Sequence, residues 1–219
     1  MDLLDFARGP ALQGALVLFA FGVLWRLASL LLLPRVKDLS KPRSGAPPAL
    51  FAALREIVRR SWPQRPFPGA TLFWTINSYI FHLGLAVVVF AFAPHILFIR
   101  SLLGLSWPSL PSNLINAVGV VTVASLLIAL ARRLTHPVLR LLSTADDYFA
   151  WIVTVLPVIT GLAATSHLGA RYETLLAVHI LSVALLLAWL PYGKLMHPFF
   201  VFITRGFTGV YLSRRGAEL

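Results

Sequence analysis

The six histidines are the side chains of this sequence that are best suited to hold a metal ion or a metal-containing cofactor. Four of them lie in or at the end of long apolar segments: His82, His95, His179 and His197. Ionisable side chains are costly in lipid and are usually functional there. The other two, His136 and His167, fall in predicted loops, where a solvated or capping role is expected. The sequence has no cysteine, which excludes thiolate-bound iron–sulfur clusters, disulfides and thiol catalysis.

The spacing of the four histidines predicts two depths in a membrane. His179 and His197 are 18 residues apart, which is five turns of a helix, so both rings face one side at positions about 27 Å apart. His82 and His95 are 13 residues apart, which is about 20 Å of rise and leaves them about 140° out of phase on an ideal helix. Pro94 removes a backbone hydrogen bond and kinks the helix, so the His95 ring need not follow that phase.

If the two segments run antiparallel, the histidines match by depth. His82 then pairs with His197 toward the cytoplasm, and His95 pairs with His179 toward the outside. Two imidazoles on opposite faces of a porphyrin suit a low-spin haem iron that transfers electrons and has no open position for a substrate. A zinc or copper site needs ligands clustered within a few ångströms, which four histidines at two depths do not offer.

The elements that must position these histidines follow from the composition. Hydrophobic residues make up 58% of the 219 residues and charged residues 12%, whereas soluble domains are about half apolar and about a quarter charged. A membrane-spanning helix needs about 20 apolar residues, and five segments qualify: 11–33, 71–99, 113–131, 148–165 and 174–192. The sequence therefore predicts an all-α membrane protein, a single bundle of five transmembrane helices in which two b haems stack between the second and fifth.

The distribution of positive charge predicts the orientation of this bundle. Of the 19 Lys and Arg residues, eight lie in the loop 34–70, three follow the third span and four lie in the tail 193–219. The opposite side has three, and Arg26 lies within the first span. Cytoplasmic loops carry the excess of Lys and Arg, which places the N-terminus outside and the C-terminus in the cytoplasm. The basic excess is thus explained by membrane topology, and no nucleic-acid partner is expected.

Part of the basic loop has the pattern of a helix that lies at a membrane surface. The stretch PALFAALREIVRRSW, residues 48–62, places apolar residues on one helical face and arginines on the other. Such a helix serves either as a surface anchor or as a docking site for a partner. The tail FFVFITRGFTGVYLSRR allows the same two interpretations.

Three stretches of the sequence resemble a known family: NSYIFHLGL, ARRLTHPVLRLLSTADDYFAWIVTVLPVITGLAA and LLAVHILSVALLLAWLPYGKLMHPF. They are similar to the haem b-containing gamma subunit of respiratory nitrate reductase and its relatives, over residues 71–205. The third stretch is the most specific, because that family carries its two ligands in the fifth span at the same spacing as His179 and His197.

The resemblance implies a fold and an activity. The family has five transmembrane helices, an outside N-terminus and two b haems, so His82 and His197 would hold the inner haem and His95 and His179 the outer one. It implies quinol oxidation near the outer haem and electron transfer to a cytoplasmic iron–sulfur subunit, in a prokaryotic cytoplasmic membrane. The chain would be an electron-transfer subunit without catalytic residues of its own. Relatives serve heterodisulfide-type and sulfur-metabolising complexes too, and the loop 34–70 fits a different cytoplasmic partner.

Four arginines are candidates for contacts with a quinol or with haem propionates. The family has a lysine near the outer haem that has been linked to quinol binding; here Arg100 is the candidate, with an outer-interface anchor as its alternative role. Haem propionates are anions that need partners, and the candidates near the cytoplasmic side are Arg26, Arg132 and Arg133. The alternative for Arg132 and Arg133 is flanking charge that orients the span.

Two other functions stay open at this point. One is a redox-inert or single-haem membrane anchor, because His95 follows Pro94 directly and lies further from His82 than the family's spacing. The other is a small proton-coupled transporter in which membrane histidines relay protons. A transporter predicts acidic residues within the spans, and the predicted span interiors contain none.

Overall fold

The computed structural model describes residues 2–34, 38–63 and 68–217, and throughout these ranges the chain is helical or irregular, without strands. Arg35, Lys37 and Arg65 of the predicted basic loop lie outside the described residues. In chain order the elements are α1 (Leu3–Phe6), the π-helical turn η1 (Ala7–Ala11), α2 (Leu12–Leu32), α3 (Ala49–Arg59), α4 (Pro68–Ala91), α5 (Ala93–Leu103), α6 (Ser112–Thr135), α7 (Pro137–Leu142), α8 (Ala145–Thr165), α9 (Tyr172–Trp189), the 3₁₀ turn η2 (Lys194–Met196) and α10 (His197–Arg215).

Five helical segments are long and apolar enough to cross a membrane: Leu3–Leu32, Thr71–Ala91, Ser112–Thr135, Ala145–Thr165 and Tyr172–Trp189. The prediction of an all-helical, multi-pass membrane protein is therefore confirmed. Large apolar side chains point outward, with Leu24 67% and Leu83 62% exposed, whereas alanines such as Ala177 are buried between helices. Small residues let membrane helices approach closely while large ones face the lipid, so this packing is that of a protein in contact with a bilayer.

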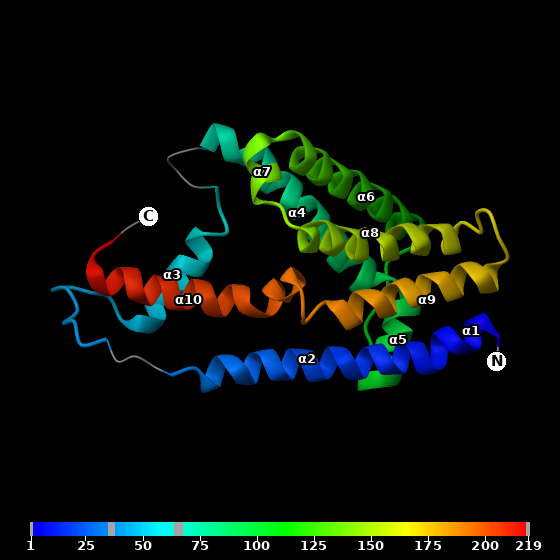
Figure 1. The fold of residues 1–219 in the computed structure, drawn as a ribbon, viewed down its shortest axis with the longest axis horizontal. Coiled ribbons are helices and arrows are strands. Elements are labelled where there is room, and N and C mark those ends of the chain that lie inside the picture. The colour runs from blue at the N-terminus through cyan, green and yellow to red at the C-terminus, as the bar shows by residue number, and fades with distance from the viewer. Residues whose placement is uncertain (1, 35–37, 64–67, 218–219) are drawn as a thin grey trace.

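The spanning helices pack in the order α4, α6, α8, α9 and α2 (Figure 1). The four histidine rings meet where α4 and α5 face α9 and α10. Figure 1 also shows α3 crossing α10 at one end of the molecule, with α7 at the same end of α6 and α8. We call this the basic end, because its helices and turns carry Arg132, Arg133, Arg140, Lys194 and Arg205.

The second predicted span is broken into two helices, which corrects the expected continuous segment 71–99. α4 ends at Ala91, Phe92 is extended with φ −88° and ψ 129°, and α5 begins at Ala93. Pro94 lies in the first turn of α5, where its missing N–H is not needed. The break changes the direction of the chain, so the phase of His95 is no longer fixed by the helix that carries His82.

A second break corrects the expectation that His179 and His197 share one continuous helix. α9 ends at Trp189, and α10 begins at His197 after Pro191, Gly193 and the short turn η2. Pro191 cannot continue a helical hydrogen-bond ladder. A Cβ on Gly193 would collide with the Trp189 indole, so glycine is required for this close turn. The 18-residue spacing therefore does not describe one helical face.

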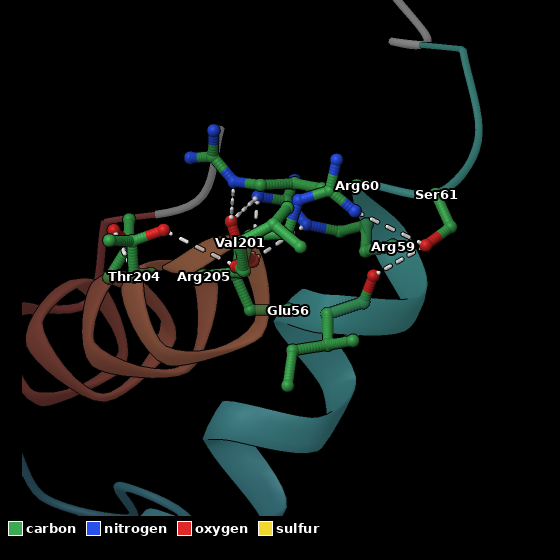
Figure 2. Close-up of polar contacts among 9 residues, drawn as sticks. Glu56, Arg59, Arg60, Ser61, Val201, Thr204 and Arg205 are labelled. Atoms are coloured by element: carbon green, nitrogen blue, oxygen red, sulfur yellow. Dashed lines mark hydrogen bonds and ion pairs between the residues drawn. The ribbon is translucent and has the colours of Figure 1, made fainter. Parts of the chain in front are cut away.

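The segment predicted as an amphipathic helix forms α3, which packs across α10 at the basic end. Gly209 of α10 lies against the Ala52 backbone, where any Cβ would collide. Glu56 forms an ion pair with Arg59 at 2.9 Å and another with Arg60 (Figure 2). Burial raises the pKa of the Glu56 carboxyl, but hydrogen bonds from Arg60 and Arg59 lower it by more, so the pKa lies below its ordinary value.

Candidate functional site

The four histidines of the membrane segments lie in two pairs. The ring centroids of His82 and His197 are 6.0 Å apart, with ring planes at 87°. Those of His95 and His179 are also 6.0 Å apart, with planes at 19°. The structure thus brings together the two pairs that the depth argument matched, although both pairs depend on helix breaks that the depth argument did not include.

Three of the rings have Nδ1 next to a backbone carbonyl oxygen. The distances are 2.7 Å from His82 to Ser78, 2.8 Å from His95 to Val88 and 3.1 Å from His197 to Lys194. A carbonyl oxygen only accepts hydrogen bonds, so we assign the ring proton to Nδ1 in each case. The lone pair is then on Nε2, which is the arrangement found in metal-binding histidines whose other nitrogen is held by the protein.

The fourth ring is held by side chains of α8 and α9. His179 Nδ1 lies 3.3 Å from Thr160 Oγ1, and Thr160 donates to the Leu156 carbonyl at 2.8 Å. The Thr160 hydroxyl therefore accepts from His179 Nδ1–H, which gives this ring the same tautomer as the other three. The Ser182 hydroxyl lies 2.9 Å from that of Thr160 and extends the network.

Because Gly161 has no side chain, the His179 ring can pack directly against α8. A Cβ at this position would lie 3.1 Å from His179 Cε1 and 3.3 Å from Nδ1, closer than side-chain packing allows without movement. Sequence reasoning missed Thr160, Gly161 and Ser182 as site residues. The available signal was a small residue and a hydroxyl next to each other within an apolar span.

The separation within each pair would allow both imidazoles to bind one metal ion. At a metal–imidazole bond length of about 2 Å, two imidazoles on opposite sides of one ion place their ring centroids about 6 Å apart. Both pairs have this separation. His82 and His197 are exposed, and His95 and His179 are half-buried, so the rings keep open flanks that a planar macrocycle could cover. Throughout the described ranges no three or more His, Cys, Asp or Glu side chains gather as a metal-binding cluster.

An acidic residue that sequence reasoning passed over connects three elements next to His197. Asp147 in the first turn of α8 forms ion pairs with Lys194 at 2.5 Å and with Arg133 at 3.2 Å. Lys194 is also the residue whose carbonyl accepts from His197 Nδ1. The signal in the sequence was the capping box of Thr144 and Asp147 at the start of α8.

The structure places the four candidate arginines in different surroundings. Arg133 has Asp147 as an anionic partner, and the Arg132 guanidinium stacks on the Trp74 ring, 4.0 Å from its centroid. Arg26 is exposed, 5.8 Å from the Phe200 ring centroid. Arg100 is exposed in the last turn of α5. Their roles toward propionates or a quinol stay predictions.

Comparison with known proteins gives a relative that matches nearly the full length of the chain. No family model matches the sequence, and no solved structure matches it. A protein of Nitratidesulfovibrio vulgaris (strain Hildenborough), named simply "Protein", is 31% identical over 220 residues, which cover 96% of this chain and 94% of that protein. Identity at this level over nearly the full length of both sequences shows that the chain belongs to the same family as this N. vulgaris protein.

Proposed function

We propose that the chain is a di-haem cytochrome b subunit of a membrane-bound oxidoreductase complex, of the type that its sequence resembles in the gamma subunit of respiratory nitrate reductase. One observation carries this proposal: two pairs of imidazoles, each with centroids 6.0 Å apart and each ring with Nδ1 next to a protein oxygen. A packing role would not require four rings in the same tautomer.

In this proposal His82 and His197 hold one haem, and His95 and His179 hold the other. A haem held by two histidines would supply one-electron transfer and would leave no position for oxygen or substrate. The hydrogen bonds at Nδ1 fix each ring's orientation and raise the basicity of Nε2. Thr160 does this for His179, and Gly161 makes room for that ring.

The charge distribution supports the orientation of the proposed subunit. The basic end would face the cytoplasm of a prokaryotic cell, because positive residues are retained on that side of the membrane. An iron–sulfur subunit would exchange electrons with the chain at this end. A quinol would be oxidised toward the opposite side, with Arg100 as the candidate contact.

The test is a count of haem in the purified protein, expressed with a full supply of haem. We expect a reduced-minus-oxidised spectrum typical of b haem and two haems per chain by pyridine haemochrome. His167→Gln serves as the matched control, since this loop histidine is outside both pairs and should leave the count at two. No haem in a folded preparation would reject the proposal and favour a redox-inert anchor or a transporter. One haem would reject the two-site form.

A further inference from the structure

The seam between α4 and α6 carries two hollows on its outer side. The one at the basic end is lined by Phe73, Trp74, Ile128, Ala131, Arg132 and His136. The other lies further along the same two helices and is lined by apolar and small residues, among them Ile80, Leu83, Gly84, Ala117, Val121 and Thr122. Phe73 precedes His82 by nine residues, about 180° around the helix. The seam is therefore on the opposite side of α4 from the histidine pair.

Arg132 brings a positive charge into the first hollow, and among the residues that the structure describes it has no acidic partner. Its guanidinium lies 4.0 Å from the centroid of the Trp74 ring, a cation–π contact that holds the charge in place. Its Nε is buried and has no hydrogen-bond partner within the described part of the chain. An unsatisfied buried donor is costly, and an anionic ligand at the guanidinium would lower that cost.

The distance between the two hollows suits the headgroup and an acyl chain of one lipid molecule. Arg132 and Thr122 are ten residues apart on α6, which is about 15 Å of rise. This is about half the thickness of the hydrocarbon core of a bilayer. The positive charge therefore lies at the membrane surface when the apolar hollow lies near the middle of the bilayer.

We propose that the α4–α6 seam binds an anionic phospholipid. The phosphate contacts the Arg132 guanidinium with His136 beside it, and an acyl chain occupies the apolar hollow between Leu83 and Ala117. Basic hollows between membrane helices on the cytoplasmic side bind anionic headgroups. The apolar hollow distinguishes a lipid from free phosphate, because inorganic phosphate would not use it. This site does not depend on haem binding.

The experiment compares lipid retention by native mass spectrometry of the full chain released from nanodiscs of phosphatidylglycerol or phosphatidylcholine. We expect phosphatidylglycerol to be retained preferentially, and Arg132→Gln to weaken its retention at least about tenfold, because a charge-assisted hydrogen bond is lost. Arg140→Gln is the matched control, since Arg140 is an exposed arginine of α7 at the same end. An equal effect of both substitutions would overturn the proposal in favour of general surface charge.

Two further variants keep the test decisive if Arg132→Gln does not fold. Trp74→Phe weakens the cation–π contact but keeps an aromatic ring, so phosphatidylglycerol retention should fall. Ala117→Phe fills the apolar hollow at an exposed position and should also lower phosphatidylglycerol retention.

Displacement of the lipid by millimolar inorganic phosphate would show a free-phosphate site instead. A dimer cross-linked along the α4–α6 seam would show that a second copy occupies it, and either result would overturn the proposal.

Discussion

The His82–His197 pair and the His95–His179 pair have the same ring separation, 6.0 Å, but they are held by different parts of the structure. In the first pair both Nδ1 atoms face backbone carbonyls three or four residues away on their own chain segment. In the second pair the His179 ring depends on Thr160 and Gly161 of another helix. The first pair is therefore fixed by local backbone. In the second pair the backbone carbonyl of Val88 holds His95, and helix packing fixes the His179 ring.

The largest expected effect is the loss of one haem when a proposed ligand is removed. His82→Leu should leave only the haem of the second pair, and His179→Leu only that of the first, because each pair binds its own iron. Haem per chain and the split of the b-type absorption bands would measure this. Loss of both haems from either substitution would show that the pairs are not independent.

A substitution of Gly161 should act on the His95–His179 pair alone. Gly161→Val places side-chain atoms where the His179 ring lies, so we expect loss of most of that haem and retention of the other. Gly14→Val is the matched control: this glycine is also within a spanning helix, but a Cβ there meets nothing within 4 Å. If both variants keep two haems, the contact between α8 and the ring is not needed.

Thr160→Val tests the same pair without changing the space around the ring. It removes the oxygen that accepts from His179 Nδ1–H, so we expect about ten- to hundredfold weaker cofactor retention at this pair, as for other outer partners of metal ligands. Thr160→Ser should restore retention, because its hydroxyl can accept the same bond. Equal retention in the Val and Ser variants would show that the Thr160 hydroxyl is not needed, with the Pro157 backbone carbonyl as the remaining acceptor for the His179 ring.

Asp147→Asn tests whether the ion pairs of Asp147 with Lys194 and Arg133 support the His82–His197 pair. Without its carboxylate, Lys194 and Arg133 lose their shared anion, and the turn that supplies a carbonyl to His197 is less restrained. We expect about tenfold weaker retention of the first haem, the lower end of the effect of outer partners. The second haem should be unchanged, and titration with a haem-capturing protein would separate the two.

The smallest expected effect is a weakening of α3 in acid, because the Glu56 carboxylate forms ion pairs with Arg59 and Arg60 of the same helix. The pKa of Glu56 is lowered from its ordinary value of 4.5, so its contribution to stability is complete above pH 4.5 and is lost as the pH falls through the lowered pKa. Hydrogen exchange in α3 should rise in that range in the native chain. Glu56→Gln should show no such acid-dependent rise, because it has no carboxyl to protonate.

The sequence was sufficient for the features that depend on composition and period. Long apolar runs predicted the five spans, and the alternation of apolar residues and arginines predicted the helix that contains Ala52 and Glu56. The paired placement of His95 was harder to predict, since ideal helix phase puts it about 140° from His82. The break at Phe92, next to Pro94, accounts for the difference.

The support of the candidate site could not be predicted from the sequence. Thr160 and Gly161 contact His179 across two helices, and Asp147 contacts Lys194 across a sequence separation of 47 residues. Such contacts depend on the rotation of each helix about its axis, which apolar periodicity does not determine in spans that are hydrophobic on all sides.

The position of His197 as the first residue of α10 has a mechanical consequence. α10 has 19 residues and is therefore about 28 Å long. If α10 tilted by about 10° about its N-terminal end, its C-terminal end would move by about 5 Å and its first residue by very little. His197 lies at the end that stays in place, so a movement of Arg214 and Arg215 at the far end, where both pair with Asp38, would leave the imidazole beside His82.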